Sequence, residues 1–167
     1  MKTILVHACC GPCACAATYE DYCYTFYFNG NNFDSRNEYD KRLFAMKQVS
    51  MGVIVELYNP KEFISCEECI RYRLLMCAKT AKEYGFDCFS TTLTISPHKD
   101  TALVNRIGKE VEKEVGVPFV EKDLKKNGGY QRSVEISKRM GLYRQTYCGC
   151  KRSHPNARPL KGSSPGF

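Results

Sequence analysis

The feature that most constrains the fold is an alternation of short β-branched or aromatic runs with longer segments of helical periodicity. Strand-like runs occur at residues 3–8, 23–28, 53–57, 86–94 and 117–120. Helices are predicted after Pro12, at about 35–51, from Cys66 to a cap at Gly85, from an Asp100 cap to about 115, and at 129–140. Alternating strands and helices predict a mostly parallel sheet covered on both faces. We therefore expect a doubly wound α/β fold with about five strands.

The length of 167 residues suits one domain with a buried core. We expect a single α/β domain over residues 1–152, followed by a basic, Pro- and Gly-rich tail at 153–167 that is disordered. The longest apolar run near the start, residues 4–6, is far shorter than a signal peptide or a membrane span requires. A cytoplasmic location is therefore expected.

Eleven cysteines are an unusual number for a chain without an export signal. Because the count is odd, a secreted disulfide framework is the weaker interpretation, and metal ligation or redox chemistry is the stronger one. Cys23, Cys77 and Cys88 fall within apolar strand or helix patterns, so we expect them to pack in the core. Cys13 and Cys15, in the first helical segment, stay ambiguous between packing and function.

Two cysteine pairs fall where a parallel sheet places its ligands. Cys9 and Cys10 follow the first predicted strand, and Cys66 and Cys69 open the helix after the third. Residues just after parallel strands gather at the carboxyl edge of the sheet, and a helix start favours the thiolate form of a cysteine. Four thiolates predict an iron–sulfur centre or a zinc site. The adjacent pair 9–10 is unusual for a zinc knuckle, which slightly favours iron–sulfur.

Two other classes of function remain open from the residues alone. A zinc-binding RNA-binding module would use the same thiols as structural ligands. A thioredoxin-like thiol–disulfide exchanger is suggested by Cys10-Gly11-Pro12-Cys13, a dithiol motif between a strand and a helix. However, the chain has more strand–helix units than that fold needs.

Four motifs occur in an order that a known family shares. They are Cys9-Cys10-Gly11-Pro12-Cys13, then Cys66-x-x-Cys69 with Tyr72-Arg73-Leu74, then Ser90-Thr91-Thr92-Leu93 with Ser96-Pro97, and finally Gly141-Leu142-Tyr143-Arg144-Gln145-x-Tyr147-Cys148-Gly149-Cys150. Together, over residues 3–152, they resemble the QueH family of epoxyqueuosine reductases. The resemblance implies an adenine-nucleotide-hydrolase-like (HUP-like) α/β fold and the reduction of epoxyqueuosine to queuosine in tRNA.

The resemblance also implies roles for six cysteines. Cys9, Cys10, Cys66 and Cys69 correspond to the ligands of a [4Fe–4S] cluster. The last two, Cys148 and Cys150, correspond to a redox-active disulfide. An additional mononuclear iron beside the cluster is implied as well. The chain departs from the family pattern at residues 57–59, which read Leu-Tyr-Asn where Asp-Tyr-Asp is expected, and in a shorter stretch before Cys66.

The charge of the chain fits a nucleic-acid partner without identifying one. The formal net charge is +7, and residues 151–167 contain four basic residues and no acidic residue. This tail is either solvated or an arm that contacts tRNA phosphates. Tyr143, Arg144 and Tyr147 are candidates for stacking on a splayed base, or for packing the last segment onto the sheet.

The implied reaction sets a chemical requirement. Conversion of an epoxide to an alkene releases one oxygen as water and consumes two electrons and two protons, which ordinary side chains cannot supply alone. We therefore expect a redox centre and an as yet unidentified electron donor. Glu67, Glu68 and Tyr147 are candidate proton donors, although a solvated helix start is the more ordinary role of the two glutamates.

Overall fold

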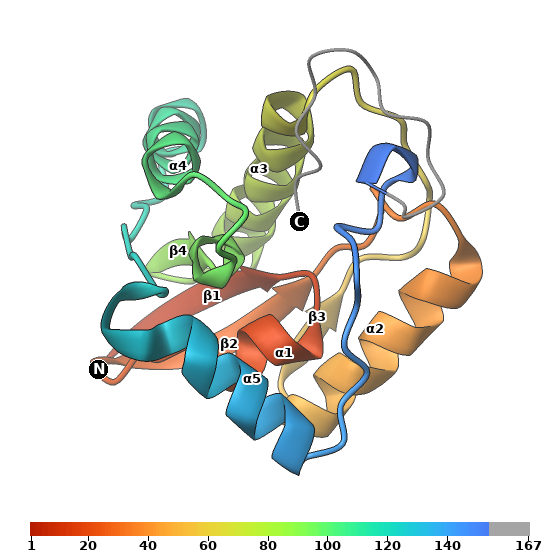
Figure 1. Ribbon diagram of the computed structural model, residues 1–167. Coiled ribbons are helices and arrows are strands. Elements are labelled where there is room, and N and C mark those ends of the chain that lie inside the picture. The colour runs from red at the N-terminus through yellow and green to blue at the C-terminus, as the bar shows by residue number, and fades with distance from the viewer. Residues whose placement is uncertain (154–167) are drawn as a thin grey trace.

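Four parallel strands form the centre of the computed structural model, which describes residues 1–153 (Figure 1). The strands are β1 (Lys2–Ala8), β2 (Tyr22–Phe28), β3 (Val53–Val55) and β4 (Cys88–Thr91), in the order β3-β2-β1-β4. β1 pairs with β2 over its whole length and with β4 from Ile4 to His7. Ile4, Leu5 and Val6 have no exposed surface, since β1 lies inside the sheet and both faces are covered.

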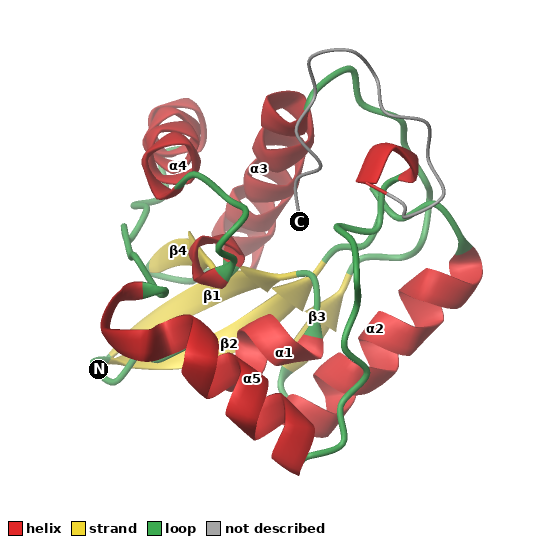
Figure 2. Ribbon diagram, viewed as in Figure 1, coloured by secondary structure: helices red, strands yellow, loops and turns green. Residues whose placement is uncertain are grey.

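Helices cover both faces of the sheet (Figure 2). They are α1 (Gly11–Cys15), α2 (Arg36–Val49), α3 (Cys66–Tyr84), α4 (Thr101–Val115) and α5 (Gly129–Arg139), with short 3₁₀ turns η1 (Leu93–Ile95), η2 (Lys126–Gly128) and η3 (Lys151–Ser153). α3 and α4 pack together on one face, whereas α1 packs against α2 and α5 on the other. The prediction of an α/β fold with a parallel sheet is confirmed.

The helix boundaries follow from local side-chain caps. The Ser35 and Ser65 hydroxyls each accept a hydrogen bond, 3.1 Å long, from the amide three residues later, at the starts of α2 and α3. The Glu68 carboxylate bonds the amide of Ile64, one residue before the cap, rather than that of Ser65. Gly85 ends α3 in the left-handed region, at φ 73°, as the sequence predicts.

The predicted fifth strand at residues 117–120 is wrong. Among residues 1–153 this segment makes only an isolated parallel bridge, between Phe89 and Phe119. The outward-facing groups of Phe119 are taken by α4, because its amide donates to Glu112 and its carbonyl accepts from Lys109. Side chains of a helix therefore stop the sheet where another strand would have extended it.

The fourth strand is shorter than the predicted 86–94. It ends at Thr91, where the side-chain hydroxyl accepts a hydrogen bond from the amide of Leu93 and turns the chain into η1. Of the expected disordered tail, 153–167, all but Ser153 lies outside the described residues. Within residues 1–153, no helix is long and apolar enough to cross a membrane.

Candidate active site

The carboxyl ends of β1 and β4 mark the point where the chain changes direction across the sheet. From β1 the chain proceeds to β2 and β3 on one side, and after α3 it returns to β4 on the other side of β1. In open α/β sheets such a switch point holds the ligand. Cys9 and Cys10 follow β1, and Cys66 begins α3 at the same edge, as predicted.

Two cavities lie at this edge. The larger, of about 470 Å³, is lined by Cys66, Cys69, Cys148 and Cys150. The smaller, of about 90 Å³, is lined by Cys9 and again by Cys148. Three side chains line both cavities, namely Arg73, Lys99 and Cys148. The structure thus brings five of the six predicted site cysteines to one region.

Cys10 is placed differently from the other five. It is fully buried and, among the residues that the structure describes, it lines neither cavity. Its thiol is hydrogen bonded to Cys13 and Cys9, and the bond with Cys13, together with burial, raises its pKa well above the ordinary value. A reactive dithiol needs the opposite shift, so this geometry disfavours the thioredoxin-like interpretation of Cys10-Gly11-Pro12-Cys13.

All eleven cysteines are free thiols in this structure. Cys77 and Cys88 are buried, as predicted, but Cys23 is exposed, and the expectation that it packs in the core is wrong. Cys23 lies in β2 near its start, where the neighbouring residues at 21 and 24 are also exposed. Within residues 1–153, no three His, Cys, Asp or Glu side chains are already arranged around a common point for a metal ion.

The donor set nevertheless fits an anionic, thiolate-bound group. Arg73 is 1% exposed, and the electrostatic influence of its guanidinium reaches Cys9, Cys69 and Cys148. Its Nε donates to the carbonyl of Cys69 at 3.4 Å, whereas Nη1 has no hydrogen-bond partner among the described residues. A buried cation with an unpartnered N–H is costly unless it faces negative charge. A cluster held by thiolates supplies such charge.

Cys148 and Cys150 form a hydrogen-bonded pair whose pKa values are shifted in opposite directions. The bond from Cys150 holds the pKa of Cys148 well below its usual range, with further lowering by Lys99, Arg73 and Arg42. The same bond raises the pKa of Cys150. The two shifts favour a thiolate on Cys148 and a thiol on Cys150. Ser153 accepts or donates a further bond to the Cys150 sulfur at 3.3 Å.

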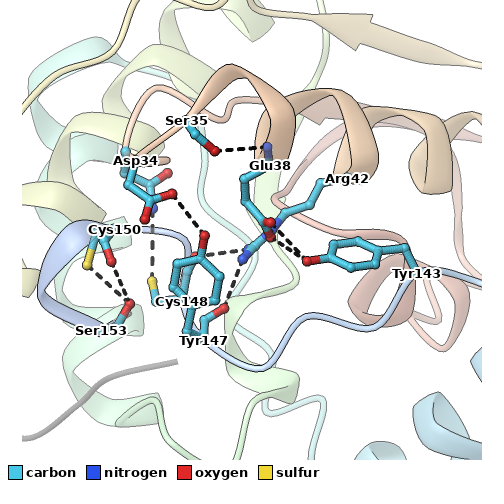
Figure 3. A network of polar contacts seen from close by, with 10 residues as sticks. Asp34, Ser35, Glu38, Arg42, Tyr143, Tyr147, Cys148, Cys150 and Ser153 are labelled. Atoms are coloured by element: carbon cyan, nitrogen blue, oxygen red, sulfur yellow. Dashed lines mark hydrogen bonds and ion pairs between the residues drawn. The ribbon is translucent and has the colours of Figure 1, made fainter. Parts of the chain in front are cut away.

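A buried ion pair on α2 holds the segment that carries these cysteines (Figure 3). Arg42 donates from Nε to Glu38 at 2.6 Å, from Nη1 to the carbonyl of Cys148 at 2.9 Å and from Nη2 to that of Tyr147 at 2.9 Å. The Tyr143 hydroxyl donates to the same carboxylate of Glu38. We call Glu38 and Arg42 the α2 clamp. It fixes the backbone on both sides of the first cysteine.

The turn between the two cysteines needs a glycine. Gly149 has a φ of 111°, and a Cβ at this position would lie 2.3 Å from the ring of Phe33. Its carbonyl accepts from the amide of Asp34 at 2.7 Å, and the Tyr147 hydroxyl donates to the Asp34 carboxylate at 2.8 Å. The loop after β2 and the last segment are thus joined directly beside the dithiol.

Several predicted accessory residues have structural roles. Tyr147 is 7% exposed and, like Tyr143, bonds a carboxylate near α2, so both help to pack the last segment. Arg144 stays exposed and lines the smaller cavity. Glu67 pairs with Arg106 on α4, and Glu68 caps α3. Neither glutamate lines either cavity in the described part of the chain.

Sequence reasoning missed four charged residues of the site, which are Glu38, Arg42, Arg73 and Lys99. A signal for three of them was present. Glu38 and Arg42 are four residues apart on one helix face, and Arg73 falls on the apolar face of α3 next to Leu74. A charged residue on an inward face needs a buried partner, which marks it as a candidate for a site.

Comparison with known proteins places the chain in a family. The family model described as epoxyqueuosine reductase QueH matches residues 4–156. A relative named epoxyqueuosine reductase QueH from Thermotoga maritima is 34% identical, over 90% of this chain and 89% of that protein. Relatives of the same name from Streptococcus pyogenes and Staphylococcus aureus are 35% and 32% identical. They cover 89% and 88% of this chain, and 69% and 73% of their own lengths.

Proposed function

The chain belongs to the epoxyqueuosine reductase QueH family, and from this membership we propose how it reduces epoxyqueuosine to queuosine in tRNA. It is an oxidoreductase of queuosine biosynthesis. We propose that it uses a [4Fe–4S] cluster and the dithiol of Cys148 and Cys150. The observation that carries the proposal is that the cysteines of two separate motifs line the same cavity. They are Cys66 and Cys69 from one motif, and Cys148 and Cys150 from the other.

Four thiols would hold the cluster, namely Cys9, Cys10, Cys66 and Cys69. Bound there, the cluster would supply a redox centre and Lewis acidity that side chains lack. Nη1 of Arg73 has no hydrogen-bond partner within residues 1–153, which supports this assignment, since the charge of Arg73 acts on two of these thiols, Cys9 and Cys69. A second, mononuclear iron fits less well. Of residues 57–59 only Tyr58 lines the larger cavity, and its hydroxyl donates to the carbonyl of Phe33.

The dithiol supplies the electrons of the reaction. Oxidation of the Cys148 thiolate and the Cys150 thiol to one disulfide releases two electrons and one proton. The epoxide takes up two electrons and two protons as it becomes an alkene and water, so a further group must supply the second proton. An external electron donor then restores the dithiol. The α2 clamp keeps the backbone carbonyls of Tyr147 and Cys148 in place. Gly149 gives this turn the conformation that brings the two sulfurs together.

The small ring of a Cys-Gly-Cys disulfide is strained, which makes it readily reducible. Because Cys150 is one half of the dithiol and is not one of the four proposed ligands, Cys150→Ser should leave the visible spectrum of the cluster intact. It should also abolish multiple turnover on tRNA that contains epoxyqueuosine. Nucleoside analysis of the tRNA and iron determination measure the two effects. Loss of iron in Cys150→Ser would instead assign this residue as a ligand. Failure of the wild-type protein, with full iron and dithionite, would contradict the proposed function.

The enzyme also needs partners and a compartment. The tRNA is the partner that carries the substrate, and the electron donor is unidentified. A cytoplasmic location agrees with free thiols, because disulfides are rare in that compartment. We also propose that residues 1–152 form the catalytic domain and that the basic segment 153–167 contributes to tRNA binding.

A further inference from the structure

Lys99 stands at the centre of the candidate site, although no motif singles it out. Its side chain lines both cavities, and the residue is 8% exposed. Its ammonium donates to the Cys148 sulfur at 3.7 Å. This is the sulfur whose pKa is lowered by the bond from Cys150 and by the surrounding cations. Lys99 is thus in contact with a reacting atom of the proposed dithiol chemistry and also reaches the space where a substrate would enter.

The backbone around Lys99 is held in a fixed turn. Its amide donates to the carbonyl of Ser96 at 3.3 Å, and its carbonyl accepts from the Lys125 ammonium at 2.6 Å. The amide of His98 donates to the Ser96 hydroxyl at 3.2 Å. These bonds tie the segment after η1 to the segment before η2. Because the backbone is fixed, the Lys99 side chain has a defined direction toward Cys148.

The reaction requires a proton at the departing oxygen, and Arg73 and the three candidates from the sequence are poorly suited to supply it. Arg73 also lines both cavities, but a guanidinium keeps its proton at neutral pH. Glu67 and Glu68 line neither cavity among the described residues, and Tyr147 donates its hydroxyl to Asp34. An ammonium that already contacts the reacting sulfur can release a proton as that sulfur loses its negative charge.

We propose that Lys99 is a catalytic residue of the epoxide reduction, pairing with the Cys148 thiolate and donating a proton to the epoxide oxygen. The inference rests on the proposed function and assigns a step within it. The Lys99 ammonium gives one proton to the oxygen, and the Cys150 thiol gives the other. Both C–O bonds break, the C=C bond and the S–S bond form, and the oxygen leaves as water.

The charges balance in this scheme. The starting pair of thiolate and ammonium is neutral overall, and it ends as a neutral amine beside a disulfide. Two electrons pass from the two sulfurs to the two carbons. The external donor then returns two electrons, and two protons from solvent restore the ammonium and the Cys150 thiol.

Two substitutions separate the two roles of Lys99. Lys99→Arg keeps a cation beside Cys148, but a guanidinium does not donate its proton. Lys99→Met keeps the length of the side chain and removes both the cation and the proton donor. The iron-loaded proteins are treated with iodoacetamide near pH 7, and fragment-ion mapping follows the label on Cys148 separately from Cys150. The same preparations are assayed for kcat and KM on tRNA that contains epoxyqueuosine. Lys61→Met, a cation that lines the larger cavity over the Tyr72 ring, is the control for alkylation.

We expect Lys99→Met to slow the alkylation of Cys148 by about tenfold or more, because the thiolate loses its nearest ammonium. Lys99→Arg and Lys61→Met should retain the wild-type alkylation rate. Both Lys99 variants should lose about a hundredfold or more in kcat with little change in KM, as removal of a general acid does.

The outcomes distinguish the inference from the function on which it rests. Wild-type alkylation in Lys99→Met would overturn the pairing with Cys148, and wild-type kcat in Lys99→Arg would overturn the proton transfer. If the wild-type protein does not convert the tRNA at all, the proposed function fails, and the proton-transfer step fails with it. The alkylation rates would still decide whether Lys99 stabilises the thiolate.

Discussion

Glu38 and Arg42 show at the scale of single residues how a buried charge can serve the site. Their side chains are 7% and 1% exposed, whereas Arg36 and Asp40, at the same spacing on the same helix, are 68% and 57% exposed. An exposed pair contributes little to stability, but the loss of one partner from a buried pair leaves an uncompensated charge.

We therefore predict that Glu38→Gln lowers the free energy of unfolding by about 3 kcal/mol. The matched substitution Asp40→Asn removes the exposed pair on the same helix and should cost less than about 1 kcal/mol. Urea denaturation of both variants measures the difference. Glu38→Gln should also impair turnover more than iron content, because the clamp acts on the dithiol segment. Equal stability losses in the two variants would contradict the role of the clamp.

The cluster assignment gives a second prediction at this scale. Replacement of any one of Cys9, Cys10, Cys66 and Cys69 by Ala should bleach the visible absorption and lower the iron content. Cys77→Ala and Cys88→Ala are matched controls, because both thiols are buried in the core, and should retain colour. If the four ligand variants keep full iron, the assignment is wrong.

The sequence predicted the cysteines of the site better than its charges. Cys9 follows β1, and Cys66 and Cys69 begin α3 at the same edge of the sheet, where the segment after α5 brings Cys148 and Cys150 beside them. Two of the partners of Arg42, by contrast, are the backbone carbonyls of residues 147 and 148, more than a hundred positions away. No local pattern encodes these two contacts, because they arise only when residues 147 and 148 fold against α2.

At the scale of whole elements, residues 118–120 bond the edge of β4, and side chains of α4 take the outward-facing groups of Phe119. The Glu112 carboxylate accepts from the amide of Phe119, and the Lys109 ammonium bonds both Glu112 and the carbonyl of Phe119. Periodicity predicted the helix and the apolar run separately. It could not show that the run would make a single parallel bridge to β4, between Phe89 and Phe119, instead of a strand.

The hydrogen bond from the Phe119 amide, with the Lys109 ammonium, holds the pKa of Glu112 below its usual value. Glu112→Ala should lower the free energy of unfolding near pH 7 by about 1.5 kcal/mol, since a charge-assisted bond to a buried segment is lost. A carboxyl whose pKa is lowered by folding stabilises the protein above its unfolded pKa, near 4.5. This stabilisation is lost as the pH falls through the lower, folded value.

The difference in unfolding free energy between wild type and Glu112→Ala should therefore shrink as the pH falls below about 4.5. Urea titrations at a series of pH values measure it. Glu114→Ala, exposed on the same helix, is the control and should show no comparable loss. A difference that is constant down to pH 3 would show that the Glu112 charge has no part in closing the edge.

At the scale of the whole molecule, the path of the chain determines where the site forms. β1 lies between β2 and β4, and the reversal of direction at its carboxyl end leaves room for the two cavities. The alternation of strands and helices was sufficient to predict this edge. The wall made by residues 58–65 and 147–152 was not predictable, because outside the short turn η3 it is irregular backbone, held by long-range bonds such as that from Arg152 to the carbonyl of Phe63.

The contact with tRNA involves the charge of the whole chain. Lysine and arginine contacts to phosphates release condensed counterions, so affinity should fall steeply with added salt. Truncation after Ser153 keeps the serine beside Cys150 and removes two basic residues, Arg158 and Lys161. If both contact phosphates, the slope of log affinity against log salt should become shallower by about 1.5, since each contact contributes about 0.7 to 0.9.

Filter binding of epoxyqueuosine-containing tRNA at several salt concentrations measures this slope. A full-length chain with Arg158→Gln and Lys161→Gln separates the effect of charge from that of chain length, and it should match the truncated protein. Both variants should retain the iron content of the wild type, because the proposed ligands lie within residues 9–69. An unchanged slope in both would assign tRNA binding to basic residues of 1–153 alone, and would show that the terminal segment has no part in it.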